Sequence, residues 1–401
     1  MRILHTSDWH LGQNFNDFDR SDEHAAFFEH LYAMARDRRP DVIVVSGDIF
    51  DTTAPPIGAQ DMYNRQMIRL SELKIPIVVT AGNHDSASRL EVSEPLWSRF
   101  GLAVVGNLQF TPDGQVDTDR HIVEIPDKGF VVAVPYIYKY RYPEIPDKAD
   151  ATIEERMEYF HNILLKRAAE RNTAKLPVVM TAHLAVAENA EKTDYDERIA
   201  AMEFCNIKSM GKGWDYLALG HIHRPSSTWN KHVRYCGSPI PLSFDETTPR
   251  SVSVVDIESL GAEPRIEEVE IPQMRRMLTV PAEPKPLNEA VAELAMLKAD
   301  EECYVRLNLL ITDLPDGDAG IRAQNALQGK KARYCGTKLT KAIFSPATDS
   351  TQPLVSVANI NNDPMAIAKA YYLQKNGVDM PDDISAMLKF AIDETINQNR
   401  L

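Results

Sequence analysis

Short apolar runs rich in β-branched residues recur through the first half of the chain. Each ends in glycine or polar residues, and the clearest are 3–6, 42–46, 77–80, 131–134, 178–181 and 216–219. Helical periodicity separates several of them, over 22–38, 59–73 and 153–172. Buried strands alternating with helices favour an α/β core. We therefore expect a two-sheet sandwich flanked by helices.

Beyond residue 220 apolar and polar positions alternate, as in half-buried strands, over 233–236, 251–257 and 266–271. We expect these strands to complete the second sheet. The proline-rich stretch 281–286 indicates a stiff connector. A helix capped by Asn288, an alternating strand at 303–311, a helix near 319–328 and a basic strand near 330–338 predict a small α+β domain.

The end of the chain has the turn and cap signals of two short helices. Asp363-Pro364 should begin the first, Asn376-Gly377 should end it, and Pro381 should begin the second. The second helix carries an apolar stripe of Ile384, Met387, Leu388, Ala391, Ile392 and Ile396. This stripe either packs on its own domain or forms a docking hairpin for a partner helix. The expected domains are 1–272, 273–347 and 348–401.

Composition changes this picture in three ways. No stretch approaches the ~20 apolar residues of a membrane span, and the start enters a strand directly, so we expect a cytoplasmic protein without membrane contact. The four cysteines are scattered without a CxxC pair, which favours free thiols over disulfides.

A net charge of −14 means that DNA binding would need local basic residues or a second subunit. The basic candidates are Arg275, Arg276, Lys330, Lys331, Arg333, Lys338 and Lys341, although a short basic run is more often a solvated face.

Five polar strings follow the apolar runs and gather one chemistry. They are DWH at 8–10, GDIFD at 47–51, GNHD at 82–85, TAHL at 181–184 and GHIH at 220–223. All lie at expected carboxyl ends of strands, where α/β sheets form their ligand crevices. Their mixed oxygen and imidazole donors suit two divalent ions such as Mn2+ better than a thiolate zinc site. The candidate ligands are Asp8, His10, Asp48, Asn83, His183, His221 and His223.

The first ligands can be assigned from their spacing. Asp8 and His10 should chelate one ion, because alternate side chains of an extended segment share a side. Asp48 is the natural bridge, since two carboxylate oxygens can hold ions ~3.5–4 Å apart. Asn83 offers an amide oxygen to the second ion, although an amide that caps a turn is the simpler explanation of an isolated asparagine.

The histidines complete the set. His221 and His223 should each reach a different ion of a close pair. His183, taken alone, would be a hydrogen-bonded core residue, but its place at a strand end supplies the nitrogen that the second ion lacks. His84 should face the substrate, because Asn83 beside it points at the metals. It could then stabilise and protonate a leaving alkoxide. Asp51 either orients His84 or is an ordinary turn or helix-cap aspartate.

These strings resemble the calcineurin-like phosphoesterases, through 5–12, 47–51, 81–86 and 220–224. The phrase RYCGSPIPLSFDE at 234–246 narrows the resemblance to the SbcD family of nuclease subunits of bacterial SbcCD complexes. The resemblance is clear up to about residue 272, extends to about residue 345, and departs at 185–198. A metallophosphatase or cyclic nucleotide phosphodiesterase on the same binuclear site, and a binding module with a vestigial site, remain alternatives.

The resemblance implies a set of functional properties. It gives one Mn2+ to Asp8, His10, Asp48 and His223, and the other to Asp48, Asn83, His183 and His221, although other divalent ions are possible. His84 would be the catalytic histidine. Family members degrade double-stranded DNA from 3′ ends and cut hairpins. They act as dimers with the SbcC ATPase, in a heterotetramer, so nucleoid association is expected. Residues 273–347 resemble the capping domain and the terminal helices resemble the SbcC-binding hairpin.

Overall fold

The computed structural model describes residues 1–187, 205–227, 230–311 and 318–341, with residues 365, 369, 372–373, 378–381 and 384–389. The chain divides into two compact units, Met1–Ala342 and Ile343–Leu401. Most of the predicted terminal hairpin lies outside the described residues, although 384–389 is helical. Among the described helices, none is long and apolar enough to cross a membrane.

The first sheet of unit 1 has the strand order β16-β15-β1-β4-β5-β6. Its strands are β1 (Arg2–Thr6), β4 (Val42–Ser46), β5 (Ile77–Thr80), β6 (Leu102–Val105), β15 (Ser251–Asp256) and β16 (Arg265–Glu270). The prediction that 251–257 and 266–271 complete the second sheet is wrong. β15 instead pairs antiparallel with β1, and β16 with β15. Alternation indicates the strand, but it does not specify which neighbour the strand pairs with. The expectation of a half-buried strand is also wrong for β15, which is buried from Ser251 to Val255.

The second sheet has the order β13-β14-β12-β9-β8-β7. Its strands are β7 (Ile122–Ile125), β8 (Gly129–Ala133), β9 (Val178–His183), β12 (Tyr216–Gly220), β13 (Ser226–Ser227) and β14 (Val233–Tyr235). Of the three alternating runs, only the one at 233–236 joins this sheet. The inner strands β8, β9, β12 and β14 run parallel, so their carboxyl ends lie along one edge.

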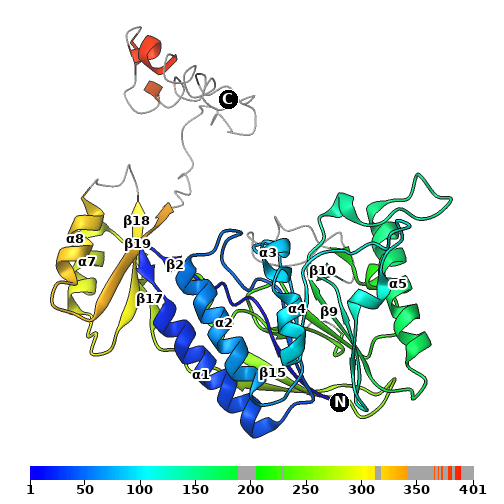
Figure 1. The fold of residues 1–401 in the computed structure, drawn as a ribbon. Helices are drawn as coiled ribbons and strands as arrows, with labels where there is room; N and C mark the ends of the chain where they lie inside the picture. Colours follow the sequence, from blue (N-terminus) through cyan, green and yellow to red (C-terminus); the bar gives the residue numbers. More distant parts are fainter. Residues whose placement is uncertain are drawn as a thin grey trace. The chain divides into compact units, whose positions relative to one another are not determined.

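Helices cover the outer faces of both sheets (Figure 1). α1 (Ser21–Arg38) and α2 (Ile57–Ser71) pack on the first sheet, where Phe28 and Met67 share a core with Val45. α5 (Ile153–Arg171) packs on the second, through Phe160 and others. A third apolar cluster fills the space between the sheets, and it includes Ile3, Val42, Val44, Val179, Tyr216 and Ala218. The predicted helix-flanked sandwich is confirmed.

Shorter elements connect these layers. They are β2 (Asn14–Phe15), β3 (Phe18–Asp19), α3 (Ala87–Glu91), α4 (Glu94–Trp97), β10 (Val186–Ala187) and β11 (Cys205–Asn206), with 3-10 turns at Ser98–Phe100, Thr118–His121, Lys139–Arg141 and Ile207–Met210. The cysteines Cys205, Cys236, Cys303 and Cys335 are all free, as predicted.

A small parallel sheet follows, in the order β17-β18-β19, with bounds Arg276–Lys285, Cys303–Ile311 and Ala332–Lys341. Helices α7 (Leu287–Met296) and α8 (Ala319–Ala326) alternate with its strands. The predicted connector at 281–286 is largely strand, because β17 is an edge strand and edges tolerate proline. Pro286 precedes α7, so Asn288 lies inside the helix rather than at its cap.

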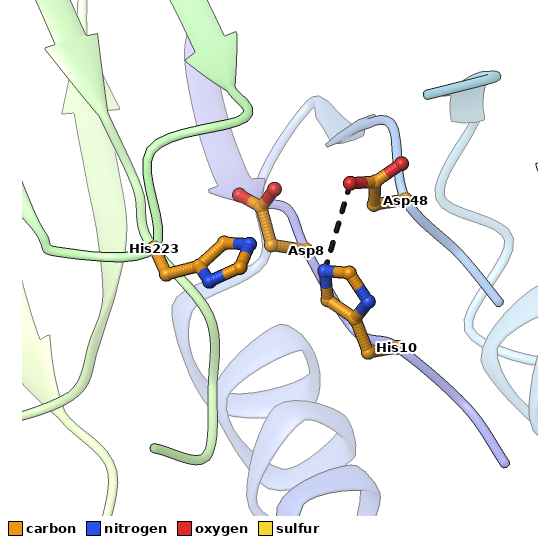
Figure 2. A group of neighbouring side chains, drawn as sticks. All are labelled: Asp8, His10, Asp48 and His223. Atoms are coloured by element: carbon orange, nitrogen blue, oxygen red, sulfur yellow. Dashed lines mark ion pairs between the residues drawn. The ribbon is translucent and has the colours of Figure 1, made fainter. Parts of the chain in front are cut away.

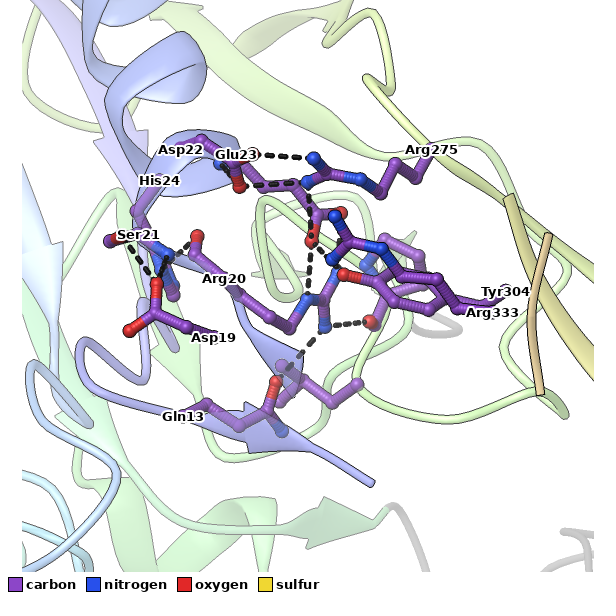
Figure 3. A network of polar contacts seen from close by, with 12 residues as sticks. Gln13, Asp19, Arg20, Ser21, Asp22, Glu23, His24, Arg275, Tyr304 and Arg333 are labelled. Atoms are coloured by element: carbon purple, nitrogen blue, oxygen red, sulfur yellow. Dashed lines mark hydrogen bonds and ion pairs between the residues drawn. The ribbon is translucent and has the colours of Figure 1, made fainter. Parts of the chain in front are cut away.

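Ion pairs join this small sheet to α1 (Figure 3). The Arg275 guanidinium is 5% exposed and contacts Asp22 and Glu302. Arg333 also pairs with Glu302, at 3.2 Å, and Lys330 donates to the carbonyl of Leu294. Three of the basic candidates for DNA contact therefore already hold contacts within the chain.

Candidate metal centre

The strands β1, β4, β5, β9 and β12 all end at one edge of the sandwich. Parallel pairing aligns β1 with β4 and β4 with β5 in the first sheet, and β9 with β12 in the second. Each of the five polar strings begins within two residues of the end of one of these strands. Their predicted position at the carboxyl ends of buried strands is confirmed.

Four candidate ligands form one group there (Figure 2). The donor atoms of Asp8, His10, Asp48 and His223 all lie within 4.8 Å of one another. Asp8, His10 and Asp48 are at most 1% exposed. Nε2 of His10 lies 3.5 Å from Oδ2 of Asp48, and it is a buried nitrogen without a hydrogen-bond partner. A cation would supply the partner that this nitrogen lacks.

The other three candidates gather around the amide oxygen of Asn83. Oδ1 of Asn83 lies 3.0 Å from Nε2 of His183 and 2.9 Å from Nδ1 of His221. Nε2 of His183 lies 3.2 Å from Oδ2 of Asp48. The same carboxylate oxygen therefore faces both groups. The other oxygen, Oδ1, accepts a hydrogen bond from the backbone N–H of His84 at 2.9 Å.

The backbone reaches this arrangement through left-handed residues, not through the extended segments assumed from the sequence. Asp8, His10 and Asp48 have φ near +50°, and His221 has φ +90°. Such conformations cost about 1–3 kcal/mol each for non-glycine residues and cluster at functional sites. They turn side chains into the cleft directly after each strand. Convergence was predicted correctly, but by a different local geometry.

Glycines in the strings let the segments approach closely. A Cβ at Gly82 would lie 2.1 Å from Oδ1 of Asp48, and one at Gly220 would lie 2.0 Å from the carbonyl oxygen of Ser46. Both distances are shorter than any non-bonded contact allows. The glycines that precede Asn83 and His221 therefore admit two neighbouring backbones into the space around Asp48.

Three histidines use one ring nitrogen as an anchor, which leaves the other for the cluster. Nδ1 of His183 lies 2.8 Å from the carbonyl oxygen of Ser46, and Nδ1 of His10 lies 3.1 Å from the Asp51 carboxylate. Nδ1 of His223 lies 3.4 Å from Oε1 of Glu246. Oxygen acceptors of this kind orient imidazoles at metal sites and select the tautomer that binds the ion.

The electrostatics of the cluster favour bound cations. Burial alone would raise the pKa of Asp48, but the charges of His183 and His10 hold it well below its usual value. Burial alone would lower the pKa of His183, and Asp48 instead raises it to about 9. Burial and the charge of His183 lower the pKa of His221 to about 4. Positive charge is thus stabilised beside Asp48, and a divalent cation could displace the proton that supplies it.

His84 lies at the exposed rim of the cluster. Its Nδ1 is 2.8 Å from the main-chain oxygen of Asp51, and its ring stands edge-on to His10 with centroids 4.8 Å apart. The sequence predicted that Asp51 could orient His84. In the structure the main-chain oxygen of Asp51 contacts His84, whereas the Asp51 carboxylate contacts His10. Asp51 thus touches both histidines.

Two acidic residues of the site were missed from the sequence. The buried Asp85 carboxylate accepts hydrogen bonds from the N–H groups of Ile49, Phe50 and Gly82, and burial raises its pKa to about 6. It thereby ties the Asp48 loop to the Asn83 loop. Glu246 supports His223. Both had a visible signal, since Asp85 ends the GNHD string and Glu246 ends the phrase at 234–246.

Known proteins match this chain along most of its length. The calcineurin-like phosphoesterase family model matches residues 1–225. The SbcD component of the nuclease SbcCD from Escherichia coli (strain K12) is 34% identical over 69% of this chain and 70% of its own length. The Rhodobacter capsulatus protein of that name is 33% identical over 85% of this chain and 88% of its own length. The Bacillus subtilis protein is 31% identical over 67% of this chain and 69% of its own length. The chain therefore belongs to the calcineurin-like phosphoesterases, and within them to the SbcD nucleases, which are metal-dependent phosphodiester hydrolases.

Proposed function

We propose that this chain is a Mn2+-dependent DNA nuclease that works with an SbcC-type ATPase. It degrades double-stranded DNA from 3′ ends and cuts hairpins and single strands. The observation that carries the proposal is the convergence of seven side chains that offer oxygen or nitrogen donors, with Asp48 among them. The relatives are named as the SbcD component of the nuclease SbcCD, which supports both the DNA substrate and the partner.

The seven donors fit two divalent cations. Asp8, His10 and His223 would hold one, Asn83, His183 and His221 the other, and Asp48 both. When bound, the two cations neutralise phosphate charge and lower the pKa of a water molecule.

The remaining chemistry falls to the chain itself. His84, at the exposed rim, donates a proton to the leaving alkoxide. Its backbone contact to Asp48 and its ring contact to the main chain of Asp51 fix its place beside the cluster. Asp85 and Glu246 keep the ligand loops and His223 in register. These contacts leave the imidazole free to face substrate while the ligands stay fixed.

The net charge of the chain favours an assembly in which other subunits help to bind DNA. A net charge of −14 disfavours DNA binding by a lone subunit. A dimer bound to two ATPase subunits would supply further positive surface and place the complex on the nucleoid. The apolar stripe that begins at Ile384 and Met387, of which Met387 is 75% exposed, is the segment we assign to the ATPase contact.

The deciding experiment is a nuclease assay on a blunt duplex and a hairpin, with Mn2+ or EDTA and with or without the ATPase subunit. We expect Mn2+-dependent cleavage that Asp48→Ala and His84→Ala each abolish. Asp300→Ala, which removes an exposed carboxylate far along the sequence from the five strings, is the matched control and should cleave normally. Hydrolysis of a phosphomonoester or cyclic nucleotide, with intact DNA under every condition, would instead identify a phosphatase or cyclic nucleotide phosphodiesterase.

A further inference from the structure

The basic residues noted in the sequence leave the question of how an acidic chain holds DNA beside the cluster. Arg275, Lys330 and Arg333 contact acidic or carbonyl groups of the chain. These three cations are already engaged, and a segment closer to the ligands offers further basic residues.

The segment 136–142 interleaves aromatic and basic residues as Tyr-Ile-Tyr-Lys-Tyr-Arg-Tyr. The side chains of Tyr138 and Tyr140 are 62% and 83% exposed, which is unusual for large rings. Lys139 and Arg141, which alternate with them, are exposed as well. Rings interleaved with cations are typical of surfaces that bind unpaired nucleic acid.

The core holds this segment in place although its rings are exposed. Tyr142 is 3% exposed and belongs to the apolar cluster under α5. Arg156 of α5 donates to the carbonyl oxygens of Tyr142 and Pro143. The N–H of Arg141 donates to the carbonyl oxygen of Tyr138 at 2.7 Å, which closes the turn. An anchored turn presents its rings at a low cost in ordering entropy.

The segment also borders the candidate metal centre. The N–H of Tyr136 donates to the carbonyl oxygen of Ala81, two residues before Asn83. The Tyr136 ring stands edge-on to His183, with centroids 6.4 Å apart. A cavity of about 290 Å³ is lined both by Tyr136, Lys139 and Tyr142 of this segment and by the candidate ligands His183 and His221.

We propose that Tyr138, Lys139, Tyr140 and Arg141 form a stacking platform for unpaired nucleotides of the DNA substrate. Base faces stack on the two rings, and the cations contact the phosphates between them. Only unpaired bases expose these faces, so the platform binds a single strand in preference to a duplex. The inference rests on the proposed nuclease function, because it names the form of DNA that this site receives.

The test measures binding separately from cleavage. The full chain is titrated into a fluorescein-labelled oligothymidylate in EDTA, and anisotropy reports the affinity. Base stacking on aromatic rings supplies much of the affinity at such surfaces, so Tyr138→Ala/Tyr140→Ala should weaken binding at least tenfold. Tyr138→Phe/Tyr140→Phe keeps both rings and should bind like the unaltered chain. Lys139→Ala/Arg141→Ala should reduce the salt dependence of binding by the loss of two phosphate contacts.

Phe110→Ala is the matched control, because it removes another ring that is 54% exposed. It should bind the oligonucleotide like the unaltered chain. Thermal unfolding of every variant checks that the fold is intact. The platform would be overturned if the folded Tyr138→Ala/Tyr140→Ala variant bound the oligonucleotide with unchanged affinity. It would also be overturned if this variant lost its association with the ATPase while its affinity for the oligonucleotide stayed intact. A chain that binds through these tyrosines yet never cleaves DNA would overturn the nuclease proposal alone.

Discussion

The Tyr304 hydroxyl donates a 2.7 Å hydrogen bond to Glu23, and so joins β18 of the small sheet to α1 of the sandwich. Both side chains are buried, and the Arg20 guanidinium contacts the same carboxylate at 2.8 and 2.9 Å. Arg20 also donates to the carbonyl oxygen of Pro241. A single buried charge pair thus connects the small sheet, the first helix and the loop that leads to Glu246.

Tyr304→Phe tests this connection with minimal change in shape. Hydrogen bonds to charged groups contribute about 1.5–3 kcal/mol, and Arg20 still neutralises Glu23 in the variant. We therefore expect the free energy of unfolding to fall by about 1–2 kcal/mol, measured by urea denaturation. Tyr140→Phe removes an exposed hydroxyl and should leave it unchanged. Equal stability of both variants would mean that the Tyr304 hydroxyl contributes nothing.

Arg275→Ala tests the neighbouring ion pairs. The guanidinium is nearly buried, whereas Asp22 and Glu302 are 47% and 48% exposed, so solvent screens their charges. The buried Glu23, 3.6 Å from Arg275, keeps its pair with Arg20. We expect a loss of about 1–2 kcal/mol in urea denaturation, below the 3–5 kcal/mol typical of a fully buried pair. Arg36→Ala, which breaks an exposed pair with Asp37, should leave the free energy of unfolding nearly unchanged. A loss no larger than that of the control would contradict the assigned role.

Much of the fold could be predicted from the sequence, because its strands and helices carry strong periodic signals. β4 and β9 are continuous apolar runs, and α5 begins at a capping box formed by Thr152 and Glu155. Strand neighbours could not be predicted in the same way. β15 and β14 have the same alternating pattern but join different sheets, because their pairing depends on long-range contacts that one strand does not encode.

The candidate site was predictable for a similar reason, since each ligand follows a strand signal. The left-handed backbone at Asp8 and Asp48 could not be predicted, since non-glycine residues adopt it only when their surroundings impose it. The distinct roles of the Asp51 carboxylate and carbonyl were equally out of reach. They depend on where the His10 ring meets the chain, which is a tertiary contact.

Mn2+ should stabilise the folded chain through the candidate site. Asp8 and Asp48 are buried in the same cluster, so the ions would neutralise two nearby carboxylates as well as bind the imidazoles. A ligand at a hundred times its Kd adds about 2.7 kcal/mol. We expect Mn2+ to raise Tm in differential scanning fluorimetry, and we expect Asp48→Ala to abolish most of this shift. Asp300→Ala should retain the shift, and an equal rise in both variants would place the ions elsewhere.

In the absence of metal, the free energy of unfolding should decrease as the pH is lowered, partly through His161. This histidine lies on α5, away from the cluster. Its Nδ1 donates to the carbonyl oxygen of Ser209, and its Nε2 is buried without a hydrogen-bond partner. Burial lowers its pKa to about 4 from the ordinary value of 6.5. Between pH 6.5 and pH 4, the unfolded chain therefore binds a proton at His161 that the folded chain excludes. In this range the free energy of unfolding decreases by up to about 1.4 kcal/mol for each unit that the pH is lowered. The contribution is complete above pH 6.5 and is lost as the pH falls toward 4.

Urea denaturation in EDTA across this range should show a shallower pH dependence for His161→Gln than for the unaltered chain. His232→Gln, at a half-buried histidine, is the control, and identical slopes for His161→Gln and the unaltered chain would show that His161 does not titrate on unfolding.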